Sequence, residues 1–128
     1  MKVLLDTHIF LALIKDGAAS LPATVAALLG DSGAEHHLSA ASLWEIAIKH
    51  RLGKLKLGLE LDTLPELLNG LGVKIVSIDE RHALASVEPE PVTRDPFDRM
   101  LLAQCQVEGL RLVTIDRALT SHPLAVRG

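Results

Sequence analysis

Aromatic residues are almost missing from this 128-residue chain, which has two phenylalanines, one tryptophan and no tyrosine. They are Phe10, Phe97 and Trp44. Proteins that hold single-stranded nucleic acid commonly stack successive bases on exposed aromatic rings. So few rings argue against a nucleic-acid platform of that kind.

The chain also has only one cysteine and no net positive charge. Cys105 is the single cysteine, which excludes an intrachain disulfide and a site with several thiolate ligands, and is typical of a reducing compartment. The net charge of −3 gives the chain as a whole no attraction for a polyanion. A protein of this charge that acts on nucleic acid needs a local basic patch or bound metal cations.

No hydrophobic run is long enough to cross a membrane, which takes about 20 apolar residues. The stretch K-V-L-L-D-T-H-I-F-L-A-L-I-K, residues 2–15, begins like a secretory signal. However, Asp6 and His8 interrupt it, and the uninterrupted run Ile9–Ile14 is short. We therefore expect a cytoplasmic protein that does not bind membranes.

The alternation of apolar runs with helical segments predicts a single α/β domain over residues 1–128, in three layers. The hydrophobic content of 48% is enough for a substantial core. Short buried strands alternating with helices are typical of a parallel sheet covered on both faces. The expected strands are Lys2–Leu5, His37–Ser39, Lys74–Ile78, Arg111–Ile115 and, at an edge, Leu124–Val126. The expected helices are Thr7–Lys15, Pro22–Leu29, Ala40–Leu52, Thr63–Leu71, Glu80–Val87 and Asp95–Glu108.

Two acids follow predicted strands directly. Asp6 ends the run V-L-L, and Asp116 ends L-V-T-I. The carboxyl ends of parallel strands form one edge of a sheet, where ligands bind in open α/β folds. Each acid alone is explained more simply as the N-cap of the next helix, which is also how we interpret Asp79.

Glu45 lies on the predicted helix Ala40–Leu52, which is apolar on most of its circumference and therefore largely buried. Its narrow polar stripe consists of Ser42, Glu45 and Lys49. A buried carboxylate needs a partner or a metal ion. An ion pair with Lys49, four residues further on, explains the buried Glu45 carboxylate about as well as a functional role such as metal binding does.

The segment R-D-P-F-D-R-M-L-L-A-Q, residues 94–104, contains two acids at one helix start. Asp95 followed by Pro96 is a typical N-cap and first helical residue, so Asp98 falls in the first turn. The helix dipole favours an acid there. Since Asp95 alone could cap the helix, Asp98 is a candidate for another role.

Strand ends and helix starts could thus bring Asp6, Glu45, Asp98 and Asp116 to one end of the sheet. Four carboxylates in one cleft repel each other and need compensating cations. Hard divalent ions with oxygen ligands, Mg²⁺ or Mn²⁺, suit such a site. These ions activate water and hold both oxygens of an in-line displacement at phosphorus, which predicts a metal-dependent phosphodiesterase.

Four segments carry a resemblance to a known family: L-L-D-T-H, S-L-W-E-I-A-I-K-H-R-L-G-K-L, R-D-P-F-D-R-M-L-L-A-Q and L-V-T-I-D, between residues 4 and 116. Together they resemble the PIN domain and, more narrowly, the VapC-type toxins of bacterial toxin–antitoxin pairs. The resemblance implies a three-layer α/β/α fold with a five-stranded parallel sheet. It also implies a ribonuclease that cleaves single-stranded or structured RNA with Mg²⁺ or Mn²⁺.

The same resemblance assigns residues and partners. By position, the catalytic and metal-binding acids are Asp6, Glu45, Asp98 and Asp116. Thr7 and Thr114 match hydroxyl residues that steady ligands or waters. The implied partners are the RNA substrate, a cognate VapB-like antitoxin whose tail fills the acidic cleft, and a second copy in a homodimer.

Basic residues near these acids are candidates for RNA binding. Lys49 and Arg51 belong to K-H-R-L-G-K-L-K, and Arg94 and Arg99 flank the third acid motif. They could contact phosphates. Alternatively, the first group complements a helix dipole at a solvated helix end, and the second pairs with Asp95 or other acids. The six histidines show no spacing typical of metal ligands.

Two other functions remain open from the sequence. A receiver-type signalling domain has a similar size, a parallel sheet and acids around Mg²⁺, but it needs two adjacent acids after the first strand, where this chain has only Asp6. A catalytically silent PIN fold that only binds RNA or an antitoxin would be favoured by a missing acid, and none is missing.

Overall fold

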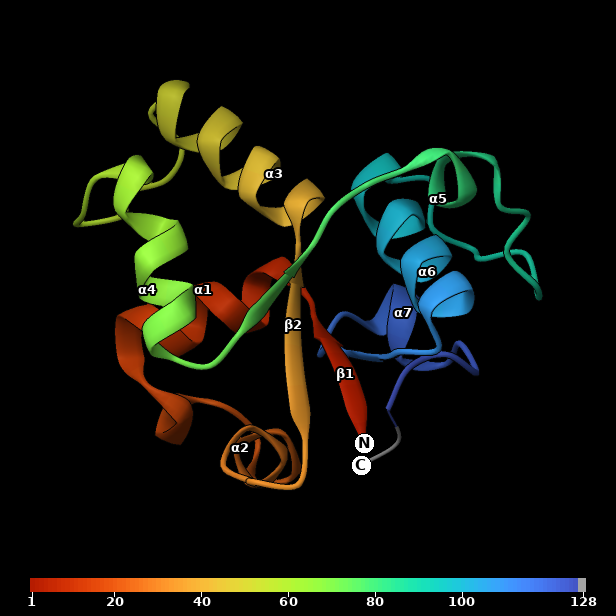
Figure 1. Ribbon diagram of the computed structural model, residues 1–128, viewed down its shortest axis with the longest axis horizontal. Coiled ribbons are helices and arrows are strands. Elements are labelled where there is room, and N and C mark those ends of the chain that lie inside the picture. The colour runs from red at the N-terminus through yellow and green to blue at the C-terminus, as the bar shows by residue number, and fades with distance from the viewer. Residues whose placement is uncertain (127–128) are drawn as a thin grey trace.

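The computed structural model describes residues 1–126, in which short parallel strands alternate with helices (Figure 1). The strands lie in the order β3-β2-β1-β4. The strands are β1 (Lys2–Leu5), β2 (Glu35–Ser39), β3 (Lys74–Val76) and β4 (Arg111–Val113). The α-helices are α1 (Thr7–Asp16), α2 (Ala23–Leu29), α3 (Ala40–Arg51), α4 (Leu64–Gly70), α5 (Glu80–Leu84), α6 (Pro96–Glu108) and α7 (Arg117–Thr120), with 3₁₀ helices η1 (Ala18–Ser20) and η2 (Leu61–Thr63).

The sheet has four strands in the described residues, so the predicted fifth strand is wrong. Over Leu124–Val126, only Ala125 forms a bridge, parallel to Leu112. The chain is still turning immediately before this point, because the Ala125 N–H donates to the His122 carbonyl at 3.0 Å. Too few extended residues remain there to build a strand beside β4.

β1 spans the predicted residues Lys2–Leu5, whereas β2, β3 and β4 differ from the prediction because each is limited by its neighbour. β4 stops at Val113 because its only strand partner, β1, ends at Leu5 in the same register. β3 pairs only with the last residues of β2 and is therefore shorter than Lys74–Ile78. In contrast, β2 begins at Glu35 rather than His37, because Lys2 of β1 extends the pairing.

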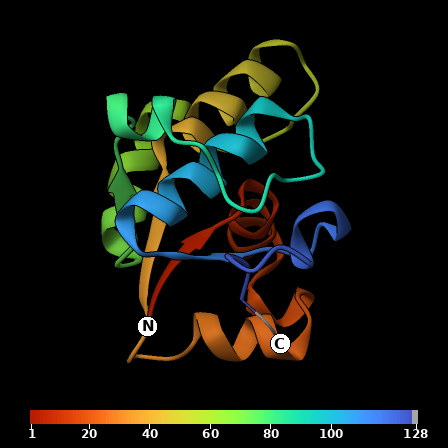
Figure 2. The ribbon, with the colours of Figure 1, turned by 90° about the vertical axis from the view of Figure 1, so that its right-hand side faces the viewer.

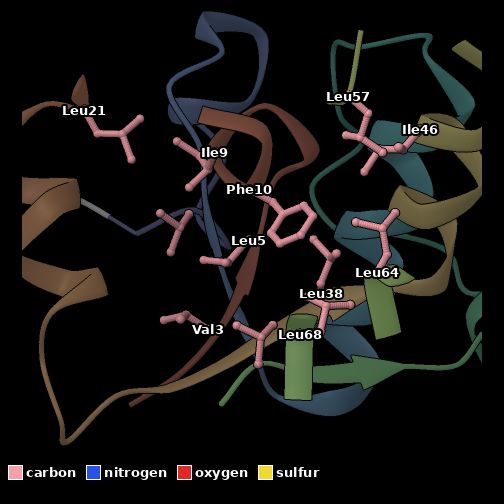
Figure 3. Close-up of a cluster of buried hydrophobic side chains, with 12 residues drawn as sticks. Val3, Leu5, Ile9, Phe10, Leu21, Leu38, Ile46, Leu57, Leu64 and Leu68 are labelled. Atoms are coloured by element: carbon pink, nitrogen blue, oxygen red, sulfur yellow. The ribbon is translucent and has the colours of Figure 1, made fainter. Parts of the chain in front are cut away.

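Helices cover both faces of the sheet and give the predicted three layers. Figure 1 shows α1, α2 and α4 on one side of the strands and α5, α6 and α7 on the other. In β1, Val3 and Leu5 point into one core and Leu4 into the other, as the alternation of a strand requires. Figure 3 shows the first core around Phe10. The second core is built by Leu4, Val87, Leu101, Leu102, Ala103, Cys105, Leu110, Leu112 and Leu119.

One end of the sheet is formed by the carboxyl ends of the parallel strands. Only Asp6 separates the end of β1 from the start of α1, and α3 follows β2 without a gap. Two perpendicular views place the N-terminus at the opposite end of the molecule from α3 (Figure 1 and Figure 2). Within residues 1–126, no helix has the length and apolar character that crossing a membrane requires.

Candidate metal and nucleic-acid site

Asp6 follows β1 and is only 3% exposed. It stands at the N-cap position of α1, yet its side chain makes no capping hydrogen bond. Instead its Oδ2 accepts a hydrogen bond of 2.7 Å from Thr114 Oγ1. Burial raises the pKa of Asp6, the Thr114 hydroxyl and His8 partly offset this, and the charge of Asp116 raises it further. Helix capping therefore does not explain this carboxylate.

Asp116 is the third residue after β4, and it does cap the next helix. Its Oδ1 accepts from the Ala118 N–H at 2.9 Å, at the start of α7. Its own N–H donates to Thr114 Oγ1 at 3.1 Å. Thr114 therefore lies between the two acids and bonds to both residues.

Asp98 lies in the first turn of α6, where Asp95 is the cap through a 2.8 Å bond from the Phe97 N–H. Thr93 Oγ1 donates to Asp98 Oδ2 at 3.2 Å. Burial, followed by the charges of Asp95, Asp6 and Asp116, raises the pKa of Asp98 to about 6. These charges act on Asp98 because the end of β1, the start of α6 and the end of β4 meet in one region.

Glu45 is buried on α3 and forms the ion pair with Lys49 that the sequence suggested, with Nζ and Oε2 2.9 Å apart. The helix that carries it is fixed to the start of α1. Thr7 Oγ1 donates to Ser42 Oγ at 2.9 Å, and both residues are buried. Glu45 thus lies one helical turn beyond this contact, with its charge compensated by Lys49.

The structure brings the three aspartates within electrostatic reach of one another, and it directs Glu45 toward Lys49. In residues 1–126, no three of these four carboxylates have oxygens that all lie within 4.8 Å of one another. Their oxygens, together with the nearby threonine hydroxyls, are the ligand type that Mg²⁺ and Mn²⁺ prefer. Since burial and mutual repulsion raise the pKa of Asp6 and Asp98, a cation would relieve an existing electrostatic cost. The residues therefore fit a divalent metal ion.

A sequence model of the PIN domain family matches residues 3–123. The chain belongs to the PIN domain family. PIN domains are typically metal-dependent nucleases, so the acidic edge of the sheet is the natural candidate for the active site. The receiver-type alternative is thereby excluded. No curated protein matches the chain significantly.

Two residues that support the acids of this PIN domain were not assigned from the sequence. Ser42 anchors α3 to Thr7, and Thr93 holds Asp98. A signal for Thr93 was present, because Thr93-Arg94-Asp95 repeats the spacing of Thr114-Ile115-Asp116. In both cases the aspartate N–H donates to the threonine hydroxyl two residues earlier, and that hydroxyl donates to an acid of the site.

A second group of metal-type ligands, Asp79, His82 and Glu108, lies away from the acids, with ligand atoms within 4.8 Å of one another. Asp79 caps α5 as predicted, and its N–H donates to His82 Nδ1 at 3.0 Å. His82 Nε2 lies 2.7 Å from Glu108 Oε2, so both ring nitrogens have partners. Arg81 binds both acids at 2.8 Å and, with backbone N–H groups, lowers the pKa of Asp79 to about 2. The ligand atoms of this group could hold a metal ion, but their charges are already compensated by Arg81 and by one another.

The four basic candidates differ in their contacts. Arg99 donates to Glu90 at 2.6 Å and to the Thr93 carbonyl at 3.0 Å, so it holds the loop before α6 and does not pair with Asp95. Lys49 is engaged by Glu45. Arg51 and Arg94 are exposed.

Proposed function

We propose that this PIN domain is an endoribonuclease that depends on Mg²⁺ or Mn²⁺ and cleaves single-stranded or structured RNA. The observation that carries the proposal is the position of the Asp98 carboxyl group, which is partly buried among other aspartates. Its carboxyl pKa is raised to about 6 by burial and by the charges of neighbouring aspartates, which include Asp6 and Asp116. Keeping these carboxylates ionised side by side costs free energy, and a bound cation would remove that cost.

In the proposed site, Asp6, Glu45, Asp98 and Asp116 hold the metal. The bound metal would activate water and stabilise the charge that develops at phosphorus during an in-line displacement. Thr114 fixes the orientation of the Asp6 carboxylate, and the Thr7–Ser42 bond fixes α3 against the start of α1. Lys49, which is 40% exposed along its side chain, is placed to exchange Glu45 for an RNA phosphate.

The biological role that we propose is the toxin of a VapBC-type toxin–antitoxin pair. Its support is the similarity of the four sequence segments to VapC-type toxins. A cognate VapB-like antitoxin would then cover the acidic cleft, and two copies of the chain would form a homodimer. The alternative, a silent PIN fold that only binds RNA or an antitoxin, is favoured by the Glu45–Lys49 pair, which satisfies one of the four acids without a metal.

Cleavage by two matched variants tests the enzymatic proposal. Asp98→Asn removes a proposed metal ligand, and we expect cleavage of a mixed single-stranded RNA in Mn²⁺ to fall by orders of magnitude. Asp95→Ala removes only the cap three residues earlier. We expect it to lose about 1 kcal/mol of stability and to retain cleavage.

The controls distinguish this enzyme from a contaminating ribonuclease and from a binding module. EDTA should abolish cleavage by the wild type, and the Asp98→Asn protein should be prepared in parallel. Equal cleavage by wild type and Asp98→Asn would assign the activity to a contaminant. Loss of cleavage in a folded Asp95→Ala protein, with cleavage kept in Asp98→Asn, would reverse the roles of the two aspartates.

A further inference from the structure

Two of the three aromatic rings of the chain lie side by side, and each directly precedes an acid of the candidate site. Trp44 precedes Glu45 on α3, and Phe97 precedes Asp98 on α6. Their ring centroids are 5.6 Å apart and the ring planes meet at 65°. The third ring, Phe10, is fully buried in the core. The rings outside the core are therefore concentrated where α3 meets the start of α6.

Trp44 is 62% exposed, which is far more than packing against Phe97 requires. In an edge-type contact at 65°, the two rings do not cover each other face to face. A large, flat and polarisable surface is thus open to solvent on the two helices that carry Glu45 and Asp98. Other strongly exposed apolar side chains, such as Leu84 and Val92, are aliphatic and offer no such surface.

We propose that Trp44, supported by Phe97, stacks one unpaired nucleobase of the substrate and so positions the neighbouring phosphodiester at the acids. This inference rests on the proposed ribonuclease function and adds to it a residue that selects substrate. A nucleobase stacks on an aromatic face whichever of the four bases it is. The ring pair would therefore favour unpaired RNA over duplex without reading its sequence.

Cations on the two segments that carry the ring pair suit a nucleic acid. Lys49 and Arg51 follow Trp44 on α3, and Arg94 lies on the segment that leads into α6. All three present exposed or partly exposed cations, which suit the phosphates on either side of a stacked base. The scarcity of aromatic residues excludes a platform for several bases, but a single ring pair is enough to hold one.

The single tryptophan makes the proposal directly measurable, because all tryptophan emission of the protein comes from Trp44. We would titrate a short single-stranded RNA into the Asp98→Asn protein, so that binding is observed without cleavage. Stacking on the indole should quench the emission. The same strand annealed as a duplex, and tripolyphosphate as a phosphate-only probe, should leave the emission unchanged. Equal quenching by tripolyphosphate would overturn the proposal.

Matched variants separate stacking from general apolar contact. In the same Asp98→Asn background, Trp44→Ala should weaken the Kd for labelled single-stranded RNA by about 5- to 150-fold, the effect of ~1–3 kcal/mol of stacking. Trp44→Phe should retain most of the affinity. Leu52→Ala is the control, because Leu52 is also 62% exposed and lies at the C-cap of the same helix. An equal loss in Leu52→Ala, or none in Trp44→Ala, would overturn the proposal.

The outcomes also distinguish this inference from the proposed enzyme. Quenching and a Trp44-dependent Kd without metal-dependent cleavage by the wild type would support the stacking site and contradict the ribonuclease. Metal-dependent cleavage without quenching, and with no effect of Trp44→Ala on the Kd, would support the ribonuclease and contradict the stacking site. If Trp44→Ala converts a dimer into a monomer in analytical ultracentrifugation and leaves the Kd unchanged, the ring pair is an interface between copies and the proposal is wrong.

Discussion

Asp98 makes the folded protein sensitive to pH in a direction unusual for an acid. Its pKa is raised from the ordinary value of 3.8 to about 6. Between these values the folded protein binds more protons than the unfolded chain, so stability falls as the pH rises from about 4 to 6. The Asp98→Asn protein has no carboxyl group at this position, so its stability should not fall for this reason between pH 4 and 6. In EDTA, the variant should therefore melt at a higher temperature than the wild type at pH 7, and the difference should shrink toward pH 4.

Asp79 provides a control with the opposite sign. Arg81 and backbone N–H groups lower the pKa of Asp79 to about 2. This carboxylate stabilises the fold above its unfolded pKa of 3.8, and the contribution disappears as the pH falls toward 2. Asp79→Asn should thus lose stability at pH 7, and the loss should be much smaller at pH 2. A melting difference for Asp98→Asn that is constant from pH 4 to 7 would contradict the raised pKa.

The residue scale also shows where sequence reasoning stops. The capping roles of Asp79 and Asp95 were predictable, because N-caps depend only on the next three residues. The same local rule suggests a cap for Asp6, and the structure shows none. The hydroxyl that holds Asp6 belongs to Thr114, 108 residues away in the chain. A contact of this sequence separation is fixed by the fold and leaves no local pattern.

At the scale of elements, the two Thr-x-Asp turns share the same hydrogen-bond arrangement. Thr93 and Thr114 each accept from the N–H of an aspartate that caps the following helix, and each donates to an acid of the site. The turn therefore couples the start of a helix to the orientation of a carboxylate. The Asp6 carboxylate that Thr114 holds is more deeply buried than that of Asp98.

Replacing either threonine by valine keeps the shape and removes the hydroxyl. Thr114→Val should lower the free energy of unfolding by ~1–3 kcal/mol, because a buried carboxylate and a backbone N–H lose their partner. Thr93→Val should cost less, since water reaches Asp98 more easily. Urea denaturation at pH 7 in EDTA measures both. A greater loss of unfolding free energy in Thr93→Val than in Thr114→Val would mean that burial of the acid does not set the strength of these hydrogen bonds.

The helices and strands themselves were largely predictable, and their ends were not. Short apolar runs that alternate with helical segments identified β1, β2, β3 and β4 together with the main helices. The ends of β3 and β4 depend on where β2 and β1 stop, which is a property of register and not of composition. The same limit explains the missing fifth strand. Leu124–Val126 is apolar enough for a strand, but the turn at His122–Ala125 leaves it no length.

At the scale of the whole molecule, a metal that joins Asp6, Asp98 and Asp116 would bind only the folded chain. Such a ligand stabilises the fold by RT ln(1 + [L]/Kd), or about 2.7 kcal/mol at one hundred times Kd. Millimolar Mn²⁺ should therefore raise the melting temperature of the wild type, and raise that of Asp6→Asn much less. Differential scanning calorimetry measures the rise.

The matched control for this metal effect is Asp79→Asn, which changes an acid of the separate His82 network. It should show the full rise in Mn²⁺. A rise lost in Asp79→Asn and kept in Asp6→Asn would place the metal at the Asp79, His82 and Glu108 group. The acidic edge of the sheet would then be a structural feature of this PIN domain.

β1 lies between β2 and β4, although it is the first strand of the chain and β4 is the last. During synthesis on the ribosome, Asp6 is therefore made more than a hundred residues before the Thr114 hydroxyl that orients it. Until β4 has been added, one side of β1 has no strand neighbour, and Asp116 does not exist. A nascent or truncated chain of this PIN domain consequently carries no complete acidic site. The proposed ribonuclease would become competent only after β4, Thr114 and Asp116 have left the ribosome and have folded beside β1.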